Sequence, residues 1–484
     1  MTRSKYFKPI PILTTAIILI LCVIFACASR YNRYGLPQYG YEYQIPEKTE
    51  DGWETSSLEA VGVDPARIGQ MIQTILDGDI ENIHGVLLVI KGKLVLEEYF
   101  DGFDRDTKHR LFSASKSVTS MLVGMALDRG MIRNLDTPVY EFFPEYKESK
   151  WIERQYAVKL KDVLTMTAGL DWSGWDYPGY DSRSTTNQLA RSSDWIKFTL
   201  NRDALQPSGK QFVYNNGLTM LLGGIVKNTS GLGADKFAEK HLFTPLGISD
   251  FTWDKGPNGA VNTAWGLSLK PRDMAKLGYL YLQQGNWNGR QVVSRQWVDE
   301  SVKDHVKQYV FLGSGYGYQW WRGKTNIQNA KIDMFYAAGH GGQFIFVCPS
   351  LDCVAIITSK WIGNPFGEFR PQMMLVNYIL PALLPTSLAT ALTPDPVDLE
   401  TYEGQYEFKK WKLTVKVRRD ENRLYLQFPK SKEAELIPIG KTRFSFYLKG
   451  LGNVQLQFSE GSSGKTDRMI AYMGFANISF DKIK

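Results

Sequence analysis

The chain has 484 residues, of which 43% are hydrophobic and 22% charged, with 43 glycines and 21 prolines. This is the composition of a globular protein of about three domains, and it excludes collagen-like, coiled-coil and largely disordered structures. The net charge of +7 comes from 57 basic and 50 acidic residues. The basic residues are spread along the chain, which argues against a nucleic-acid partner, because such proteins concentrate basic residues in one stripe or arm.

The first 28 residues predict an export leader or a single membrane anchor. Three basic residues among the first eight precede an apolar run over 10–28. Three fates are open: lipidation of Cys27 in the lipobox-like IFAC, cleavage at small residues around it, or retention as an uncleaved span of about 19 residues. Each of them places the rest of the chain outside the cytoplasm, in the periplasm or at the cell surface.

The next segments predict a tether followed by a folded domain. Residues 29–52 are rich in Tyr, Pro and Gly without periodicity, so we expect a tether there and a domain over 53–385. The run 85–100 predicts two strands that turn at Lys91-Gly92. Apolar residues at helical spacing predict a helix over 113–128, which Gly130 would end.

The last third predicts a sheet, a helix and a second domain. Strand patterns at 344–347 and 354–358 are joined by a four-residue turn, and an apolar helix follows over 373–384. Residues 386–398 are a Pro/Thr-rich linker. Five strand-like runs at short intervals within 399–484 then predict a small antiparallel barrel or sandwich.

Cysteine and histidine usage argues against a metal or other cofactor. The chain has four cysteines and five scattered histidines, with no Cys-x-x-Cys and no His-Glu-x-x-His. Cys348 and Cys353 flank the turn between the two predicted strands. In an oxidising compartment they could form a disulfide, or they could be two small buried thiols.

The first candidate for chemistry is Ser113 with Lys116. Residues three apart share a helical face, so the lysine amine can lie beside the serine hydroxyl. The positive end of the helix favours an alkoxide and helps to lower the lysine pKa. The alternative is a helix-capping serine followed by a surface lysine.

Two further elements follow in the chain. Tyr214-Asn215-Asn216 forms a turn ahead of an apolar helix, and a buried phenol near a lysine can relay a proton. Residues 339–343 (GHGGQ) precede a strand, where consecutive glycines let a substrate approach the backbone. Taken alone, the tyrosine and His340 could equally be structural.

In this order the three elements resemble the serine β-lactamase and penicillin-binding-protein superfamily, whose first motif is Ser-x-x-Lys. The resemblance is greatest to class C β-lactamase-like hydrolases, a group with esterases, D-amino-acid peptidases and 6-aminohexanoate-dimer hydrolases. It covers roughly 53–385, including LFSASKSVTSMLVGMALDRGM, VLTMTAGLDW and AAGHGGQFIFV. It implies an α/β (α+β) fold, in which an antiparallel sheet is flanked by helices beside an all-helical subdomain. The final residues resemble a lipocalin-like β domain.

The resemblance also implies roles for residues, and a serine hydrolase that needs no cofactor. Ser113 is the expected nucleophile, Lys116 its base and Tyr214 the proton relay. The backbone N–H groups of Ser113 and Gln343 are the expected oxyanion hole. Substrate contacts are expected from Asn216, His340, Gly341 and Gly342.

One departure bears on the substrate. The sequence has no Lys-Thr-Gly and no Ser-Asp-Asn, and His340-Gly341-Gly342 stands where the family has Lys-Thr-Gly. A neutral histidine is a weaker anion site than lysine, which favours small esters, amides or peptides over β-lactams. The alternatives are a D,D-peptidase or β-lactamase, and a non-catalytic protein that senses peptidoglycan fragments. The oligomeric state is not predicted.

Overall fold

The computed structural model describes residues 40–146, 158–173, 184–308, 312–327, 330–360, 367–384, 396–409, 413–421, 423–429, 433–438, 442–448, 452–461, 466–472 and 477–484. The leader with Cys27 and most of the predicted linker therefore lie outside the described residues. No helix within the described ranges is both long and apolar enough to cross a membrane.

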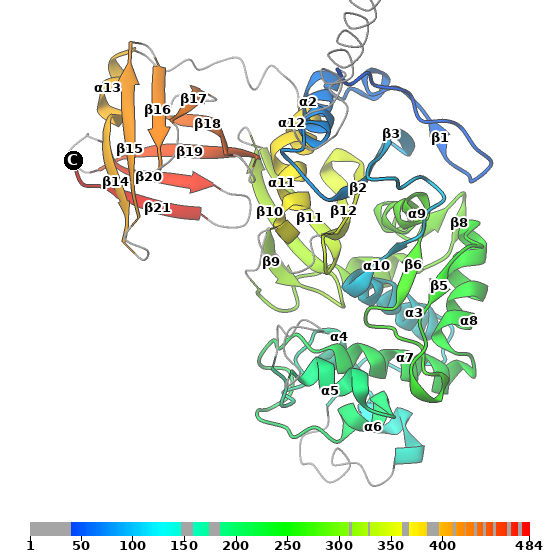
Figure 1. Ribbon diagram of the computed structural model, residues 1–484. Coiled ribbons are helices and arrows are strands. Elements are labelled where there is room, and N and C mark those ends of the chain that lie inside the picture. Colours follow the sequence, from blue (N-terminus) through cyan, green and yellow to red (C-terminus); the bar gives the residue numbers. More distant parts are fainter. Residues whose placement is uncertain are drawn as a thin grey trace, which may run out of the picture.

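An eight-stranded sheet forms the centre of the N-terminal domain (Figure 1). Its order is β1 (Glu54–Thr55), β3 (Lys93–Tyr99), β2 (Ile83–Ile90), β13 (Cys353–Ser359), β12 (Gln343–Cys348), β11 (Ala330–Gly339), β10 (Trp321–Ile327) and β9 (Gly313–Tyr316). All neighbours are antiparallel except β1 and β3, which pair in parallel. The hairpin expected at Lys91-Gly92 is confirmed, since both residues adopt the positive φ of a tight turn.

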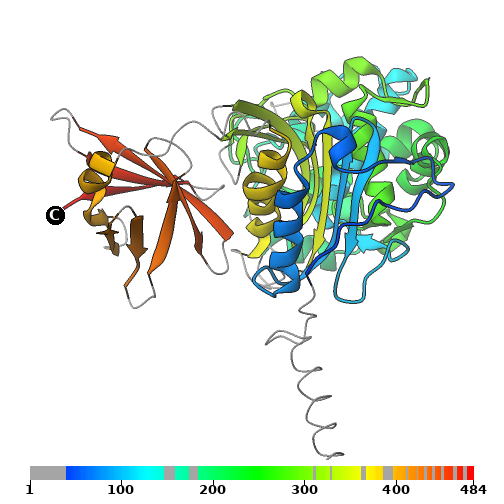
Figure 2. The same cartoon turned by 90° about the horizontal axis from the view of Figure 1, so that it is seen from above.

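Helices cover both faces of this sheet, as predicted (Figure 2). One face carries α2 (Pro65–Leu76), α11 (Arg370–Met374), the π-helical turn η10 (Leu375–Ile379) and α12 (Leu380–Ala382). The other face carries α3 (Ser115–Asp128) and α9 (Pro271–Leu282). Because both faces are covered, β2, β12 and β13 are buried along their whole length.

A helical part lies at one end of the sheet. The described residues between 111 and 251 form helices, turns and isolated bridges, with no named strand. The main helices there are α4 (Leu160–Leu164), α5 (Thr185–Arg191), α6 (Trp195–Leu200), α7 (Asn216–Ser230) and α8 (Ala234–Ala238). This is the predicted all-helical subdomain. The elements β4 (His109–Arg110), β6 (Leu267–Leu269) and β5 (Thr252–Trp253) form a small sheet beside it, and β7 (Asn286–Trp287), β8 (Arg290–Gln291) and α10 (Arg295–Ser301) complete the domain.

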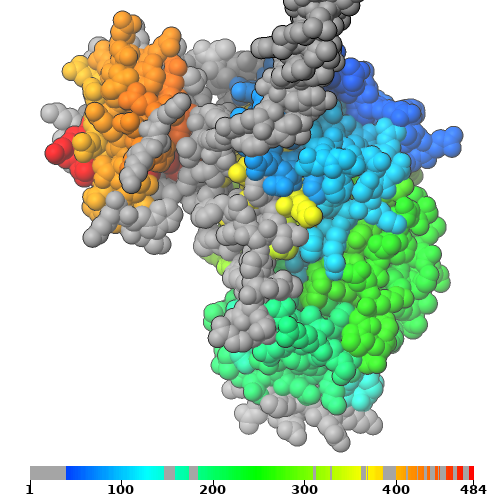
Figure 3. Space-filling model, in the orientation of Figure 1, coloured from blue at the N-terminus to red at the C-terminus, as the bar shows by residue number. Residues whose placement is uncertain are grey.

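The C-terminal domain is a closed antiparallel barrel, seen in orange and red as a separate lobe in Figure 3. After α13 (Pro396–Tyr402) come β14 (Gly404–Phe408), β15 (Leu413–Asp420), β16 (Arg423–Gln427), β17 (Ala434–Pro438), β18 (Arg443–Leu448), β19 (Gly452–Glu460), β20 (Thr466–Tyr472) and β21 (Asn477–Lys482). The barrel form of the prediction is therefore the correct one, with three more strands than the sequence pattern indicated.

Residues 41–51 correct the predicted tether. Tyr41 donates from its hydroxyl to Glu98 (2.6 Å), and the Tyr43 hydroxyl donates to the carbonyl of Val95 (2.8 Å). The Arg272 guanidinium, 5% exposed, donates to the carbonyl of Glu47 (2.8 Å) and the carboxylate of Asp51 (3.1 Å). We call residues 41–51 the N-terminal strap, because these side chains fasten it to the domain.

The two cysteines of the predicted hairpin face each other across β12 and β13, where Cys348 pairs with Cys353. Both are buried free thiols in the structure. Of the two interpretations that the sequence left open, the structure therefore has the pair of thiols and not the disulfide. A hydrogen bond with Cys348, together with burial, raises the pKa of the Cys353 thiol well above its usual value.

Candidate active site

Ser113 lies in the 3₁₀ turn η2 (Phe112–Ala114), directly ahead of α3. The helix thus starts two residues later than predicted. Phe112 has a φ of 47°, a left-handed conformation that L-residues adopt rarely and that clusters at functional sites. Ala114 holds the N-cap position of α3 and makes no side-chain cap. The capping interpretation of Ser113 is therefore wrong, and its hydroxyl is available to Lys116.

Lys116 is buried at the centre of the site, with 1% of its surface exposed. Its Nζ lies 3.1 Å from the Oγ of Ser113, 2.7 Å from the Oδ1 of Asn216 and 2.9 Å from the carbonyl oxygen of Ala264. The surface-lysine interpretation is wrong as well. All three partners are uncharged, and burial lowers the pKa of the amine well below its ordinary value.

These partners decide where the hydrogens of a neutral Lys116 point. A neutral amine has two N–H donors and one lone pair. The oxygens of Asn216 and Ala264 can only accept, so both N–H groups are directed to them. The lone pair is left facing the third partner, and the Ser113 hydroxyl can donate to it. This is the geometry required of a nucleophile and its general base.

Asn216 is held in a fixed orientation by a second contact. It is the first residue of α7, which Asn215 caps by accepting from the N–H of Leu218 (3.2 Å). The Nδ2 of Asn216 donates to the Oγ1 of Thr186 in α5 (2.9 Å), and both side chains are buried. Because the amide nitrogen is engaged there, its oxygen is the atom that faces Lys116.

Tyr214 also lies at the lysine. The Nζ of Lys116 is 4.9 Å from the centre of its ring. The ring of Trp321 stacks on that of Tyr214, with centroids 6.0 Å apart and an interplanar angle of 21°. The half-buried ring of Tyr214 thus lies close to both the lysine and Trp321 of β10.

The turn His340-Gly341-Gly342 connects β11 to β12. Gly341 and Gly342 have φ of 77° and 90°, a region that favours glycine. A Cβ on Gly342 would collide with the Oγ of Ser359, which donates to the carbonyls of Gly341 (2.6 Å) and Gly342 (3.0 Å). The Gln343 side chain donates to the carbonyl of Ser359, so it supports the same turn.

This turn packs directly on the nucleophile turn. A Cβ on Gly339, the last residue of β11, would collide with the carbonyl of Leu111. The ring of His340 meets that of Phe112 edge to face, with centroids 5.6 Å apart. The structure therefore brings Ser113, Lys116, Tyr214 and Asn216 into one cluster, with the 340–342 turn beside it.

Comparison with known proteins assigns the family. The family model described as Beta-lactamase matches residues 73–374, more than half of the chain. The chain belongs to the beta-lactamase family. A second model, a domain of unknown function (DUF3471), matches residues 388–482, the region of the barrel.

Similar proteins include hydrolases and penicillin-binding-protein homologues. The 6-aminohexanoate-dimer hydrolase of Paenarthrobacter ureafaciens is 28% identical over 58% of this chain and 74% of its own length. The beta-lactamase of Escherichia coli K12 is 28% identical over 34% of this chain, and only 39% of its length is matched. The fold resembles the octameric penicillin-binding protein homologue from Pyrococcus abyssi, with a TM-score of 0.53, 18% identity, and coverage of 86% of this chain and 99% of that one.

The expected fold, the family and the class of enzyme are thereby confirmed: this is a beta-lactamase-fold protein of a family of serine hydrolases that act on amides and esters. Sequence reasoning missed two partners in the site. The carbonyl of Ala264 carries no signal in its residue type, because any residue supplies a carbonyl. Thr186 is one of many threonines, and only the fold brings it to Asn216.

A buried histidine pair near the nucleophile turn was also missed. The Nδ1 of His84 lies 2.8 Å from the Nε2 of His109, four residues before Ser113, and Phe103 stacks on His84 at 3.8 Å. Burial lowers the pKa of both imidazoles to about 4, with Lys360 adding to the effect on His84 and His84 to that on His109. Among the described residues, no group of three His, Cys, Asp or Glu side chains could hold a metal ion.

Proposed function

We propose that this protein hydrolyses small linear esters or amides through an acyl-enzyme on Ser113. The observation that carries the proposal is the buried Lys116, whose two carbonyl partners leave its lone pair directed at the Ser113 hydroxyl. A protein of this fold that had lost catalysis and only bound peptidoglycan fragments would have no need of a desolvated amine beside a serine.

In the proposed reaction, Ser113 Oγ attacks the substrate carbonyl carbon while its proton moves to the Nζ of Lys116. The oxyanion that forms would be bound by the backbone N–H groups of Ser113 and Gln343, at the junction of η2 and β12. Tyr214 relays the proton to the leaving alcohol or amine, and the C–O or C–N bond breaks. Water then attacks the acyl-enzyme with the same groups acting in reverse, which regenerates Ser113 and releases the carboxylic acid.

The nature of the 340–342 turn supports neutral linear substrates. A lysine at position 340 would be a permanent cation, whereas a histidine there is not permanently charged. Losing one charge-assisted hydrogen bond to a β-lactam carboxylate is worth about 1.5–3 kcal/mol, or roughly 10- to 150-fold in transition-state binding. The hydrolase from Paenarthrobacter ureafaciens, by its name, acts on a 6-aminohexanoate dimer and not on a β-lactam, which is in keeping with the same substrate class.

The proposal is tested first with an activity-based fluorophosphonate probe. We expect the wild-type protein to be labelled and Ser113→Ala to show no labelling. Ser120→Ala is the matched control, because Ser120 lies on the same helix and its buried hydroxyl makes no hydrogen bond within the described residues. Equal labelling of Ser113→Ala and Ser120→Ala would overturn the assignment of the nucleophile.

The substrate class is tested by comparing kcat/KM for p-nitrophenyl butyrate, a D-Ala-D-Ala peptide and nitrocefin. We expect the ester to be turned over at least ~10-fold faster than nitrocefin, for the reason given above. A preference for nitrocefin would make this chain a β-lactamase, and a preference for the peptide would make it a D,D-peptidase.

We further propose that the protein is exported and held at the membrane through its leader. The basic and apolar pattern of residues 1–28 supports this, and Cys27 is the candidate for lipidation. Membrane fractionation of the wild type and Cys27→Ala tests both points. Release of only the variant supports a lipid anchor, whereas retention of both supports an uncleaved span.

A further inference from the structure

Next to the proposed active site, five buried residues connect α3 and α7 through a ring of hydrogen bonds. Ser117 of α3 donates to the carbonyl of Gln319 (2.7 Å), and the Oε1 of Gln319 accepts from the Thr219 hydroxyl of α7 (2.8 Å). The return path runs through Thr263, which donates to the carbonyl of Thr219 (2.8 Å). The carbonyl of Thr263 is in turn the nearer acceptor of the Thr119 hydroxyl of α3 (2.9 Å). We call these five residues the hydrogen-bond ring, and none of them is more than 2% exposed.

Two members of the hydrogen-bond ring are connected to the partners of Lys116. Thr263 directly precedes Ala264, whose carbonyl accepts from Lys116. Thr219 lies three residues after Asn216 in α7, on the same face of the helix. A shift of either threonine therefore moves an oxygen that directs an N–H group of Lys116.

Gln319 connects the ring to the rest of the site. Its carbonyl accepts from Ser117, the residue that follows Lys116 in α3. It also lies two residues before Trp321, which stacks on Tyr214. Through this one residue, the segment that leads into β10 is linked to the helix of the proposed base and to the helix that follows the proposed proton relay.

The contacts of Gln319 fix the orientation of its side-chain amide. The Nε2 atom donates to the carbonyl of Leu164 in α4 (2.8 Å), which can only accept. Oε1 is therefore the atom that faces Thr219, and the Thr219 hydroxyl donates to it. The main chain of Gln319 has a φ of 62°, a left-handed conformation that costs energy in a residue other than glycine. The hydrogen bonds of Gln319 to three helices hold this conformation in place.

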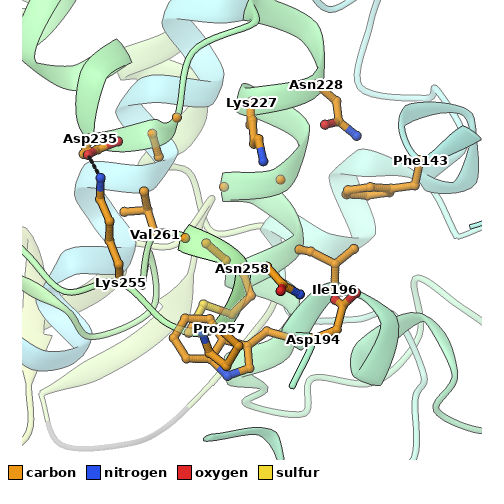
Figure 4. Close-up of a pocket in the computed structure, with 18 of the residues that line it drawn as sticks. Phe143, Asp194, Ile196, Lys227, Asn228, Asp235, Lys255, Pro257, Asn258 and Val261 are labelled. Carbon is orange, nitrogen blue, oxygen red and sulfur yellow. Dashed lines mark ion pairs between the residues drawn. The ribbon is translucent and has the colours of Figure 1, made fainter. Parts of the chain in front are cut away.

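Apolar packing leaves the position of α7 relative to α3 incompletely fixed. The structure describes both helices in full, and between them the bond from Lys116 to Asn216 is the one direct hydrogen bond. Part of α7 also borders a cavity of about 280 Å³, where Lys227 and Asn228 extend from the helix (Figure 4). A surface that faces a void has no packing partner there. The hydrogen-bond ring therefore contributes a directional link that packing does not supply.

We propose that Gln319 is a positioning residue of the hydrolytic reaction: it holds α3 and α7 at the separation at which Asn216 reaches Lys116. When this link is lost, the Oδ1 of Asn216 no longer directs one N–H group of the lysine. The lone pair of the lysine is then no longer held toward the Ser113 hydroxyl, and acylation slows although nucleophile and base are both present. The inference rests on the proposed function, because acylation of Ser113 is its readout.

The test measures the rate and the final extent of fluorophosphonate labelling on the full-length protein. Gln319→Met keeps the length of the side chain but has no amide, so it should lower the labelling rate at least ~10-fold and still allow complete labelling. A merely structural role would reduce the labelled fraction and leave the rate unchanged. Gln372→Met is the matched control, because Gln372 is equally buried and its amide makes no hydrogen bond within the described residues.

Variants of Thr219 decide the question even if Gln319→Met does not fold. Thr219→Val removes the same hydrogen bond from the other side and should slow labelling about 10-fold, whereas Thr219→Ser keeps the hydroxyl and the wild-type rate. The double variant Gln319→Met/Thr219→Val should be no slower than Gln319→Met, because both changes remove one shared bond. An unchanged rate in Gln319→Met or Thr219→Val, or rate losses that multiply in the double variant, would overturn this inference. A wild-type protein that is not labelled would instead overturn the proposed function.

Discussion

The N-terminal domain and the C-terminal barrel fill their interiors with different kinds of side chain. The barrel core is apolar and aromatic, with Phe458 stacked on Tyr402 at 4.5 Å, and Thr466 is the only buried polar residue among its described positions. The N-terminal domain buries many polar and charged groups, including Lys116 and Arg272. Burying a polar group lowers the stability of the folded state unless the group has hydrogen-bond or charge partners. These buried groups therefore mark places where side chains have a role besides packing.

The largest effect on stability is expected from a substitution in the apolar core of the barrel. Phe458→Ala should lower the free energy of unfolding of the barrel by about 3–5 kcal/mol, because it removes a buried ring from the aromatic centre. Hydrogen exchange on the full-length protein would show the loss of protection in β14–β21. Labelling of Ser113 by the fluorophosphonate should stay unchanged, and a parallel loss of labelling would show that the barrel takes part in the chemistry.

The next effect concerns the lysine. Lys116→Ala should lower the rate of acylation about 100-fold while the fold is retained, because it removes the general base. In the wild type the rate should rise with pH through the depressed pKa of Lys116 and then level off, since only the neutral amine can accept the proton. Pre-steady-state kinetics against pH measure both. A variant that keeps the wild-type pH dependence would contradict the role of Lys116, and Lys240→Ala serves as the control.

The histidine pair should make the N-terminal domain sensitive to acid. Both pKa values are lowered to about 4, so the folded state binds fewer protons than the unfolded state between pH 6.5 and 4. Stability must therefore fall as the pH drops through this window, by about 2 kcal/mol for one histidine between pH 6.5 and 5. Urea unfolding at pH 7 and pH 5 tests this. The difference between the two pH values should shrink in His84→Phe/His109→Leu, and an unchanged difference would refute it.

The smallest effect is expected at Thr186, which acts only through Asn216. Thr186→Val removes the acceptor for the Asn216 amide, which can then turn its nitrogen toward Lys116 and occupy the lone pair. Acylation should fall about 10-fold, and the midpoint of the pH–rate profile should move down because an N–H facing the amine disfavours its charged form. Thr186→Ser should restore both values. If Val and Ser variants behave alike, Thr186 has no positioning role.

Most of the fold that could be predicted was predicted from patterns between residues close together in the sequence. The spacing of Ser113 and Lys116 places both on one helical turn. The residue types of Lys91-Gly92 are enough by themselves to predict a turn. The strands β14, β17 and β21 were missed because each has few apolar residues with a charged residue among them, and β17 ends in Pro438. They become strands because the barrel has to close.

Partners far apart in sequence could not be predicted in this way. Lys116 and Ala264 are 148 residues apart, and His84 and His109 are 25 apart, so only the tertiary fold brings each pair together. The strap was misread for a related reason. Its tyrosines look like those of any irregular segment until Glu98 and Arg272 are placed beside them.

With the proposed leader in a membrane, the strap would limit how far the domain can move from the lipid surface. Because Tyr41 is fastened to the domain, only residues 29–40 separate the domain from the end of the proposed leader. Even fully extended, twelve residues span about 40 Å. A domain attached by so short a segment would stay within a thin layer above the lipid surface. Its effective concentration toward substrates released there or embedded in the envelope would then far exceed that of a freely diffusing enzyme.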